Sequence, residues 1–163
     1  MAQSLYNKTD GVVVLTDANF TGSKITSGFK GPGVLKAYAV WCPHCVNKVE
    51  SFKLLAECFR EEKIGLVVYT IEADQNRNFS SACEIEAFPT IMYVDEKGNA
   101  TKLTDATGNG VSEIPEILDA LCQGKKKCLK TSKCASKQTG GARPGLKRAR
   151  FAEANGTFFN SPY

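Results

Sequence analysis

The sequence of 163 residues predicts an α/β protein in which a mixed central sheet of about five strands is flanked by about four helices. Short apolar runs rich in β-branched residues, which are typical of strands, alternate with segments whose apolar residues recur at spacings of three and four. This alternation predicts parallel strands joined by helices. Near residue 98 two strand-like runs are separated only by a turn, which adds an antiparallel hairpin and makes the sheet mixed.

The first half of the chain supplies two strands and the longest helix. The run over 12–15 predicts a strand, and Thr16 or Asp17 is placed to cap a helical turn after it. A glycine-rich loop leads to a second strand over 34–40. Apolar residues on one face predict a single helix over 43–63, namely Val46, Val49, Phe52, Leu55, Ala56 and Phe59.

The second half supplies the remaining strands and helices. A continuous apolar run over 65–71 predicts a strand near the centre of the sheet, and residues 76–86 predict a short helix. The strands over 91–94 and 100–104 form the hairpin. The last helix begins at Ser112, which is a good N-cap residue.

Charge divides the chain at about residue 122. Residues 1–122 hold 11 Lys and Arg against 16 Asp and Glu, whereas residues 123–163 hold 10 Lys and Arg against one acidic residue. A change of this kind is typical of a domain boundary. We therefore expect a folded domain over 1–122 and a basic, cysteine-containing C-terminal extension over 123–163.

The strongest chemical signal is the run Trp41-Cys42-Pro43-His44-Cys45. It lies between the second predicted strand and the long helix, so Cys42 falls at the first turn and Cys45 one turn later on the same side. Two sulfurs placed in this way can close a disulfide. The helix N-terminus and a cationic His44 would favour the Cys42 thiolate, which is the attacking species, and Pro43 suits the first helical position.

The alternative for two cysteines at this spacing is half of a zinc site, or a pair of unrelated core residues. Zinc needs a second pair at similar spacing, or histidines. His44 is the only histidine, and no two of the other five cysteines repeat the spacing. The sequence therefore favours redox chemistry and predicts no metal.

The sequence resembles the thioredoxin superfamily over roughly residues 5–122. Three blocks carry the resemblance: LTDANF at 15–20, AVWCPHC at 39–45 and IEAFPT at 85–90. The resemblance implies a thioredoxin fold. It also implies that Cys42 is the exposed nucleophile and Cys45 the buried resolving cysteine.

The third block implies a substrate-binding segment next to Trp41, which matches the tryptophan that packs beside the active site. Pro89 matches a proline whose preceding peptide bond is cis. The backbone of Phe88 would then lie next to the sulfurs, and an extended substrate could pair with Phe88, Pro89 and Thr90 as an added strand. The alternative is a trans proline that opens an edge strand.

Three features depart from the usual pattern of the family. Lys36 lies six residues before Cys42, where the family usually has an acid that helps to move the proton of the resolving thiol. This lysine either extends its ammonium to solvent or adds positive potential under the thiolates. Val46 replaces a basic residue that commonly follows the second cysteine. Pro43 and His44 resemble the dipeptide of the periplasmic oxidase DsbA, which implies a disulfide more oxidising than that of thioredoxin.

These residues predict a thiol–disulfide oxidoreductase that exchanges a Cys42–Cys45 disulfide with protein thiols and disulfides, tuned by Lys36, Trp41 and the Pro43-His44 dipeptide. The same two sulfurs serve oxidation and reduction, and we expect the oxidase-like or isomerase-like direction. No cofactor is implied, and the redox partner is unknown. The alternative is a thioredoxin-like scaffold whose basic tail binds nucleic acid or a partner protein.

Composition favours a globular protein of the cytoplasm. The chain is 42% apolar and 23% charged, no stretch is apolar enough for a membrane span, and the N-terminus lacks a signal-peptide pattern. An oxidant-like motif without a secretory signal would fit a large DNA virus that forms virion disulfides in the host cytoplasm. Source and location are expectations from this logic alone.

The extension has two features without a single interpretation. Cys122, Cys128 and Cys134 recur every six residues, which matches neither a metal site nor a helical face, and we expect free thiols. Electron transfer to the active site, or a bond to a partner, are the alternatives. The basic residues could bind nucleic acid or an anionic surface, serve as a nuclear address, or act as a solubilising tail.

Overall fold

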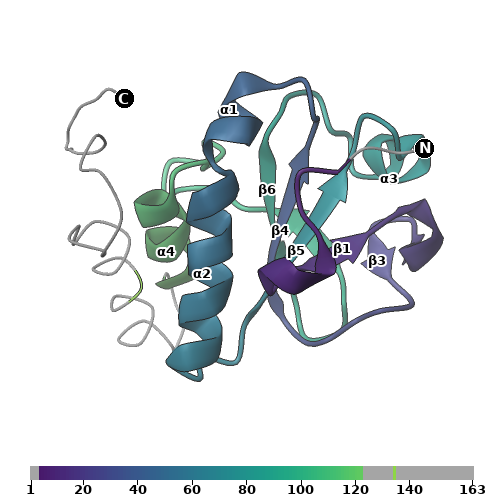
Figure 1. The fold of residues 1–163 in the computed structure, drawn as a ribbon. Helices are drawn as coiled ribbons and strands as arrows, with labels where there is room; N and C mark the ends of the chain where they lie inside the picture. The colour runs from purple at the N-terminus through teal and green to yellow at the C-terminus, as the bar shows by residue number, and fades with distance from the viewer. Residues whose placement is uncertain (1–3, 123–133, 135–163) are drawn as a thin grey trace.

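The computed structural model describes residues 4–122 and Cys134, and its centre is a five-stranded sheet in the order β1-β5-β4-β6-β7 (Figure 1). Strands β1, β5 and β4 run parallel, while β6 and β7 are antiparallel to their neighbours. The predicted mixed sheet is therefore confirmed. Its strands are β1 (Val13–Leu15), β4 (Gly33–Tyr38), β5 (Val67–Glu72), β6 (Thr90–Val94) and β7 (Ala100–Lys102).

Helices cover both faces of the sheet (Figure 1). One core lies between the sheet and α2 with α4, around Phe52 and Ile117, and a second core lies on the opposite face around Phe79 of α3. Every residue of β4 is buried because this strand lies at the centre of the sheet with helices on either side. The helices of the described residues are α1 (Pro43–Asn47), α2 (Val49–Glu61), α3 (Arg77–Ala82) and α4 (Ile114–Cys122).

The single helix predicted over 43–63 is wrong, because the structure interrupts it at Lys48 between α1 and α2. The backbone carbonyl of Cys45 accepts the N–H of Lys48 at 3.3 Å and the ammonium of Lys36 at 2.9 Å. A side chain that enters the helical hydrogen-bond ladder in this way is a known cause of kinks. The buried lysine and the end of α1 are therefore coupled.

The sequence interpretation missed a small hairpin beside the main sheet. It lies between the predicted helical turn and the glycine-rich loop, and its two-residue strands are too short to give a repeating apolar pattern. The capped turn predicted after β1 is confirmed, with Thr16 as its N-cap. The additional elements are η1 (Lys8–Asp10), η2 (Asp17–Asn19), β2 (Phe20–Thr21) and β3 (Lys24–Ile25).

Cysteines outside the Cys-x-x-Cys motif correct the expectation of free thiols in the extension. Cys134 forms a disulfide with Cys58 of α2, with the two Cα atoms 5.7 Å apart, and both residues are buried. Cys122 at the end of α4 is also disulfide-bonded. Among the described cysteines, Cys42, Cys45 and Cys83 are free. The two bonded cysteines are 76 positions apart, so the regular six-residue spacing in the extension gave no indication of this disulfide.

The rest of the extension, including its basic residues and Cys128, lies outside the described residues, so its predicted roles stay predictions. Within the part that is described, no helix is long and apolar enough to cross a membrane.

Candidate active site

The two sulfurs of the Cys-x-x-Cys motif lie where the central strand β4 leads into α1. Cys42 is the N-cap residue of α1, and Pro43 occupies the first helical position, where a missing N–H costs nothing. Cys45 follows one turn later. Cys42 is only 5% exposed and Cys45 is fully buried, so Cys42 is less accessible than its match to an exposed nucleophile implied.

Burial and the neighbouring sulfur make Cys45 a weak acid. Desolvation, and then a hydrogen bond with the Cys42 side chain, raise the pKa of Cys45 to about 12. A hydrogen bond with the Ala39 backbone and the charge of Lys36 act in the opposite direction. In the reduced protein Cys45 is thus a thiol that retains its proton at neutral pH.

The segment before β6 faces Cys42 from the other side. The Phe88–Pro89 peptide bond is cis, as the resemblance implied. The thiol of Cys42 donates to the Phe88 carbonyl oxygen at 3.5 Å, and the Phe88 ring meets the Trp41 ring edge to face at 5.7 Å. Thr90 pairs with Ala37 of β4 at the start of β6. The predicted substrate-binding residues therefore border Cys42.

The residues at the mouth of the site are exposed. Trp41 is 63% and Val46 is 45% exposed, and His44 also faces solvent on α1. An exposed indole beside an exposed aliphatic side chain can contact an apolar group of an incoming protein chain. The structure brings Trp41, Pro43 and His44 to this surface, while their tuning roles stay predictions.

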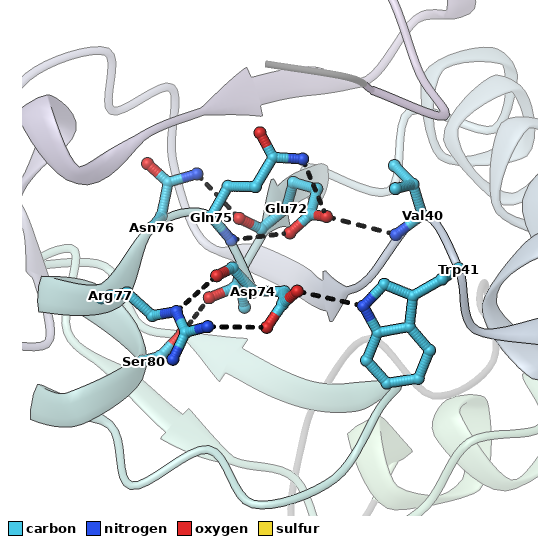
Figure 2. Close-up of polar contacts among 9 residues, drawn as sticks. Val40, Trp41, Glu72, Asp74, Gln75, Asn76, Arg77 and Ser80 are labelled. Atoms are coloured by element: carbon cyan, nitrogen blue, oxygen red, sulfur yellow. Dashed lines mark hydrogen bonds and ion pairs between the residues drawn. The ribbon is translucent and has the colours of Figure 1, made fainter.

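Figure 2 shows two carboxylates at the C-terminal end of β5 and just after it that hold the segment before α1. Glu72 accepts the Val40 backbone N–H at 3.2 Å, and Asp74 accepts the indole N–H of Trp41 at 3.0 Å. The backbone N–H of Gln75 also donates to Glu72, at 3.0 Å. These bonds fix the direction in which the chain enters the motif.

Sequence reasoning missed Glu72 and Asp74 as residues that support the site. A signal was available, because two acids directly follow the apolar run that forms β5. Since β4 and β5 are parallel neighbours, their carboxyl ends meet at the same edge of the sheet. Side chains placed there can reach the segment that follows β4.

Lys36 lies on the other side of the motif, in the middle of β4, and it does not extend to solvent. It is fully buried, and its Nζ donates to the Tyr6 hydroxyl at 2.6 Å and to the Cys45 carbonyl at 2.9 Å. Burial lowers the pKa of Lys36 to about 8, while the neighbouring Cys45 favours the charged form. The solvent-reaching alternative for Lys36 is therefore wrong.

With this geometry described, comparison with known proteins gives the family. The family model described as thioredoxin matches residues 11–120, so the chain belongs to the thioredoxin family. Its similarity to the first thioredoxin domain of mouse protein disulfide-isomerase A4 has a TM-score of 0.52 at 21% identity, over 86% of each chain, and supports the thioredoxin fold.

Curated relatives include protein disulfide-isomerases. The chain is 30% identical to protein disulfide-isomerase 1 of Caenorhabditis elegans over 96 residues, which are 59% of this chain and 19% of that protein. It is 32% identical to the protein disulfide-isomerase A6 homolog of Drosophila melanogaster over 126 residues, which are 76% of this chain and 27% of that protein. The chain thus spans less than a third of these two relatives.

Proposed function

We propose that the protein is a thiol–disulfide oxidoreductase that exchanges a Cys42–Cys45 disulfide with protein thiols, acting as an oxidase or isomerase more than as a reductase. The observation that carries this proposal is the pairing of Cys42 and Cys45 across the first turn of α1, with the Phe88 carbonyl 3.5 Å from the Cys42 sulfur. The relatives named as disulfide-isomerases support the same chemistry.

In the oxidising direction a substrate thiolate attacks the Cys42 sulfur. The Cys42–Cys45 bond breaks, its electron pair goes to Cys45, and a mixed disulfide forms between the substrate and Cys42. A second substrate thiolate then attacks the substrate sulfur of the mixed disulfide, and Cys42 leaves as a thiolate. The substrate has lost two electrons, and the two cysteines have gained them.

In the isomerising direction the reduced pair acts on an existing substrate disulfide. The Cys42 thiolate attacks one substrate sulfur and releases the other as a thiolate. Either a different substrate thiolate displaces Cys42, which reshuffles the substrate, or Cys45 loses its proton and resolves the mixed disulfide. Because Cys45 is buried and its pKa is raised, its attack on the mixed disulfide is slow. This leaves time for the substrate disulfides to reshuffle.

The charges around the sulfurs support the oxidising direction. Lys36 interacts with both Cys42 and Cys45, and no described carboxylate forms an ion pair with it. Because Cys45 retains its proton, positive potential favours the reduced pair through a Cys42 thiolate, and a stabilised reduced form makes a disulfide more oxidising. The exposed His44 on α1 adds a group that can carry positive charge.

The test measures oxidative refolding of a reduced, unfolded protein and reshuffling of a scrambled one, with the wild type, Cys42→Ser and Cys45→Ser. We expect Cys42→Ser to lose both activities and Cys45→Ser to accumulate mixed disulfides. Cys83→Ser is the matched control, because this free thiol lies in the core on the α3 side of the sheet. It should not be required for either activity. Full activity of Cys42→Ser would contradict the proposal.

A second candidate is a thioredoxin-like scaffold, favoured by the low accessibility of both sulfurs. In that case the basic extension would bind nucleic acid or a partner protein, and Cys42→Ser would retain the cellular function. For the oxidoreductase, we further propose a cytoplasmic location and a viral source, which are tested by localising the full chain in its own host.

A further inference from the structure

Lys36 is a charged residue at the centre of the molecule, and no acidic residue in the described part of the chain forms an ion pair with it. Its ammonium lies 5.1 Å from the centre of the Tyr6 ring and 4.8 Å from that of Phe52, both within range of a cation–π contact. Its ammonium donates hydrogen bonds to the Tyr6 hydroxyl and the Cys45 carbonyl. Isolated charge is expensive to bury, so this arrangement requires an explanation.

The groups that face Lys36 come from every element packed around it. Tyr6 lies in the N-terminal segment, Tyr38 in β4 itself, Cys42 and Cys45 at α1, and Lys48 between α1 and α2. The facing position on β5 is Thr70, which carries no charge.

Among these neighbours, burial raises the pKa values of Tyr6 and Tyr38, so both hydroxyls stay neutral. Lys48 carries the same sign as Lys36. The groups in this set that can become negative near Lys36 are therefore the two thiols, and Cys45 has the larger effect of the two on the pKa of Lys36. The ammonium is fixed to the backbone of the residue whose sulfur it would stabilise.

We propose that Lys36 is a positioning residue that accelerates both the opening and the closing of the Cys42–Cys45 disulfide by stabilising negative charge on the Cys45 sulfur. The inference rests on the proposed function. When a substrate thiolate attacks Cys42, the electron pair of the breaking bond goes to Cys45, beside the Lys36 ammonium. In the reverse step Cys45 gives up its proton to solvent and attacks Cys42 of the mixed disulfide, again with the ammonium beside it.

By stabilising the Cys45 thiolate, the Lys36 ammonium speeds both the opening and the closing of the disulfide. Because Cys45 then takes up a proton and ends as a thiol, the charge changes these rates more than it changes the equilibrium between the disulfide and the dithiol. This separates the role of Lys36 from a merely structural one. It also gives a pH signature, because the assistance is lost when Lys36 loses its own proton, at a pKa of about 8 in the reduced protein.

The experiment uses the full chain and compares wild type with Lys36→Met, which keeps the length of the side chain and removes its charge. Lys53→Met is the matched control, because Lys53 lies on α2 and pairs with Asp10 and Glu50 at the surface. Reduced glutathione opens the disulfide, and the fluorescence of Trp41, the single tryptophan, follows the reaction. In a Cys42→Ser background, the rate of Cys45 alkylation at pH 7, where Lys36 is charged, reports how far the ammonium favours the Cys45 thiolate.

We expect Lys36→Met to slow opening and closing about tenfold each at pH 7, and to slow Cys45 alkylation at pH 7 by a similar factor. Lys53→Met should match the wild type. Opening, closing and alkylation rates all within about twofold of the wild type would overturn the role of Lys36. If neither the wild type nor Lys53→Met reacts with glutathione, the proposed function fails instead.

Tyr6→Phe is the second variant, and it decides the matter if Lys36→Met does not fold. It keeps the ring and removes the hydroxyl that accepts the hydrogen bond of Lys36. The pKa of Lys36 should then fall, so the rate advantage should disappear at a lower pH than in the wild type. An unchanged pH profile would contradict the inference.

Discussion

The two sides of the candidate active site are held by opposite kinds of charge. Beneath Cys45 a buried cation, Lys36, is surrounded by neutral rings. Beside Trp41 two carboxylates, Glu72 and Asp74, hold the chain through hydrogen bonds to N–H groups (Figure 2). The cation lies where it can act on a sulfur, whereas the carboxylates contact the backbone and the indole. The Lys36 side therefore acts on the reactivity of the sulfurs, and the carboxylate side fixes the path of the chain into the motif.

The largest effect on stability is expected from removing the Phe52 ring, which lies against the Lys36 ammonium. Phe52 is fully buried and its ring contacts the Lys36 ammonium. Phe52→Ala should lower the free energy of unfolding by about 3–5 kcal/mol, because a cavity replaces the ring. Urea denaturation measures the loss, and Phe52→Leu should lose less. An equal loss for both variants would mean that the cavity is not the cause.

The charge of Lys36 should also appear in the pH dependence of stability. Its pKa is lowered from 10.5 to about 8, so between these pH values the unfolded chain holds a proton that the folded chain lacks. Stability therefore gains from this group as pH rises through that window. The advantage of Lys36→Met over the wild type should be greatest below pH 8 and shrink by about 3 kcal/mol toward pH 10.5.

Paired urea titrations of the two proteins across this window check the sign, because the other titrating groups are common to both. An advantage that grows with pH would contradict the burial of a charged Lys36. Replacing a buried charge by an apolar side chain of similar size is often neutral or stabilising, so Lys36→Met should fold.

On the carboxylate side, Glu72→Gln should reduce stability and leave the chemistry largely intact. The substitution keeps the shape but weakens acceptance from the N–H groups of Val40 and Gln75, at a cost of about 1–3 kcal/mol. Denaturation measures this loss, and the opening rate with glutathione should remain within about twofold. A rate loss as large as that of Lys36→Met would abolish the distinction between the two sides.

The smallest effect is expected from Asp74→Asn, which weakens an exposed hydrogen bond to Trp41. Stability should fall by about 0.5–1.5 kcal/mol. The emission of Trp41 should change because its indole loses a charged acceptor, whereas Asp95→Asn, in the distant β6–β7 turn, should leave the emission unchanged. Equal spectra for Asp74→Asn and the wild type would argue against the contact.

Much of the fold could be predicted because its strands and helices carry strong periodic patterns. The run that forms β5 is mostly apolar and rich in β-branched residues, and the turn before β7 is marked by Gly98. The redox motif at Cys42 and Cys45 could be predicted from its local spacing. The cis bond before Pro89 was expected only because three short blocks resemble the thioredoxin superfamily.

The remaining features depend on contacts between distant residues. The break at Lys48 coincides with a hydrogen bond from Lys36, twelve positions earlier, to the Cys45 carbonyl. The Cys58–Cys134 disulfide joins residues 76 positions apart. Lys36 itself was noticed, but its burial depends on Tyr6, which no sequence pattern connects to it. Tertiary contacts of this kind have no signature in periodicity.

The most direct measurement is the reduction potential of the Cys42–Cys45 pair. Full-length protein carrying Cys83→Ser, with its other disulfides retained, is equilibrated with glutathione, and mass spectrometry of trapped thiols gives the state of this pair alone. The account predicts a potential above about −200 mV, in the range of oxidases and isomerases. A value near about −270 mV, like that of thioredoxin, would contradict it.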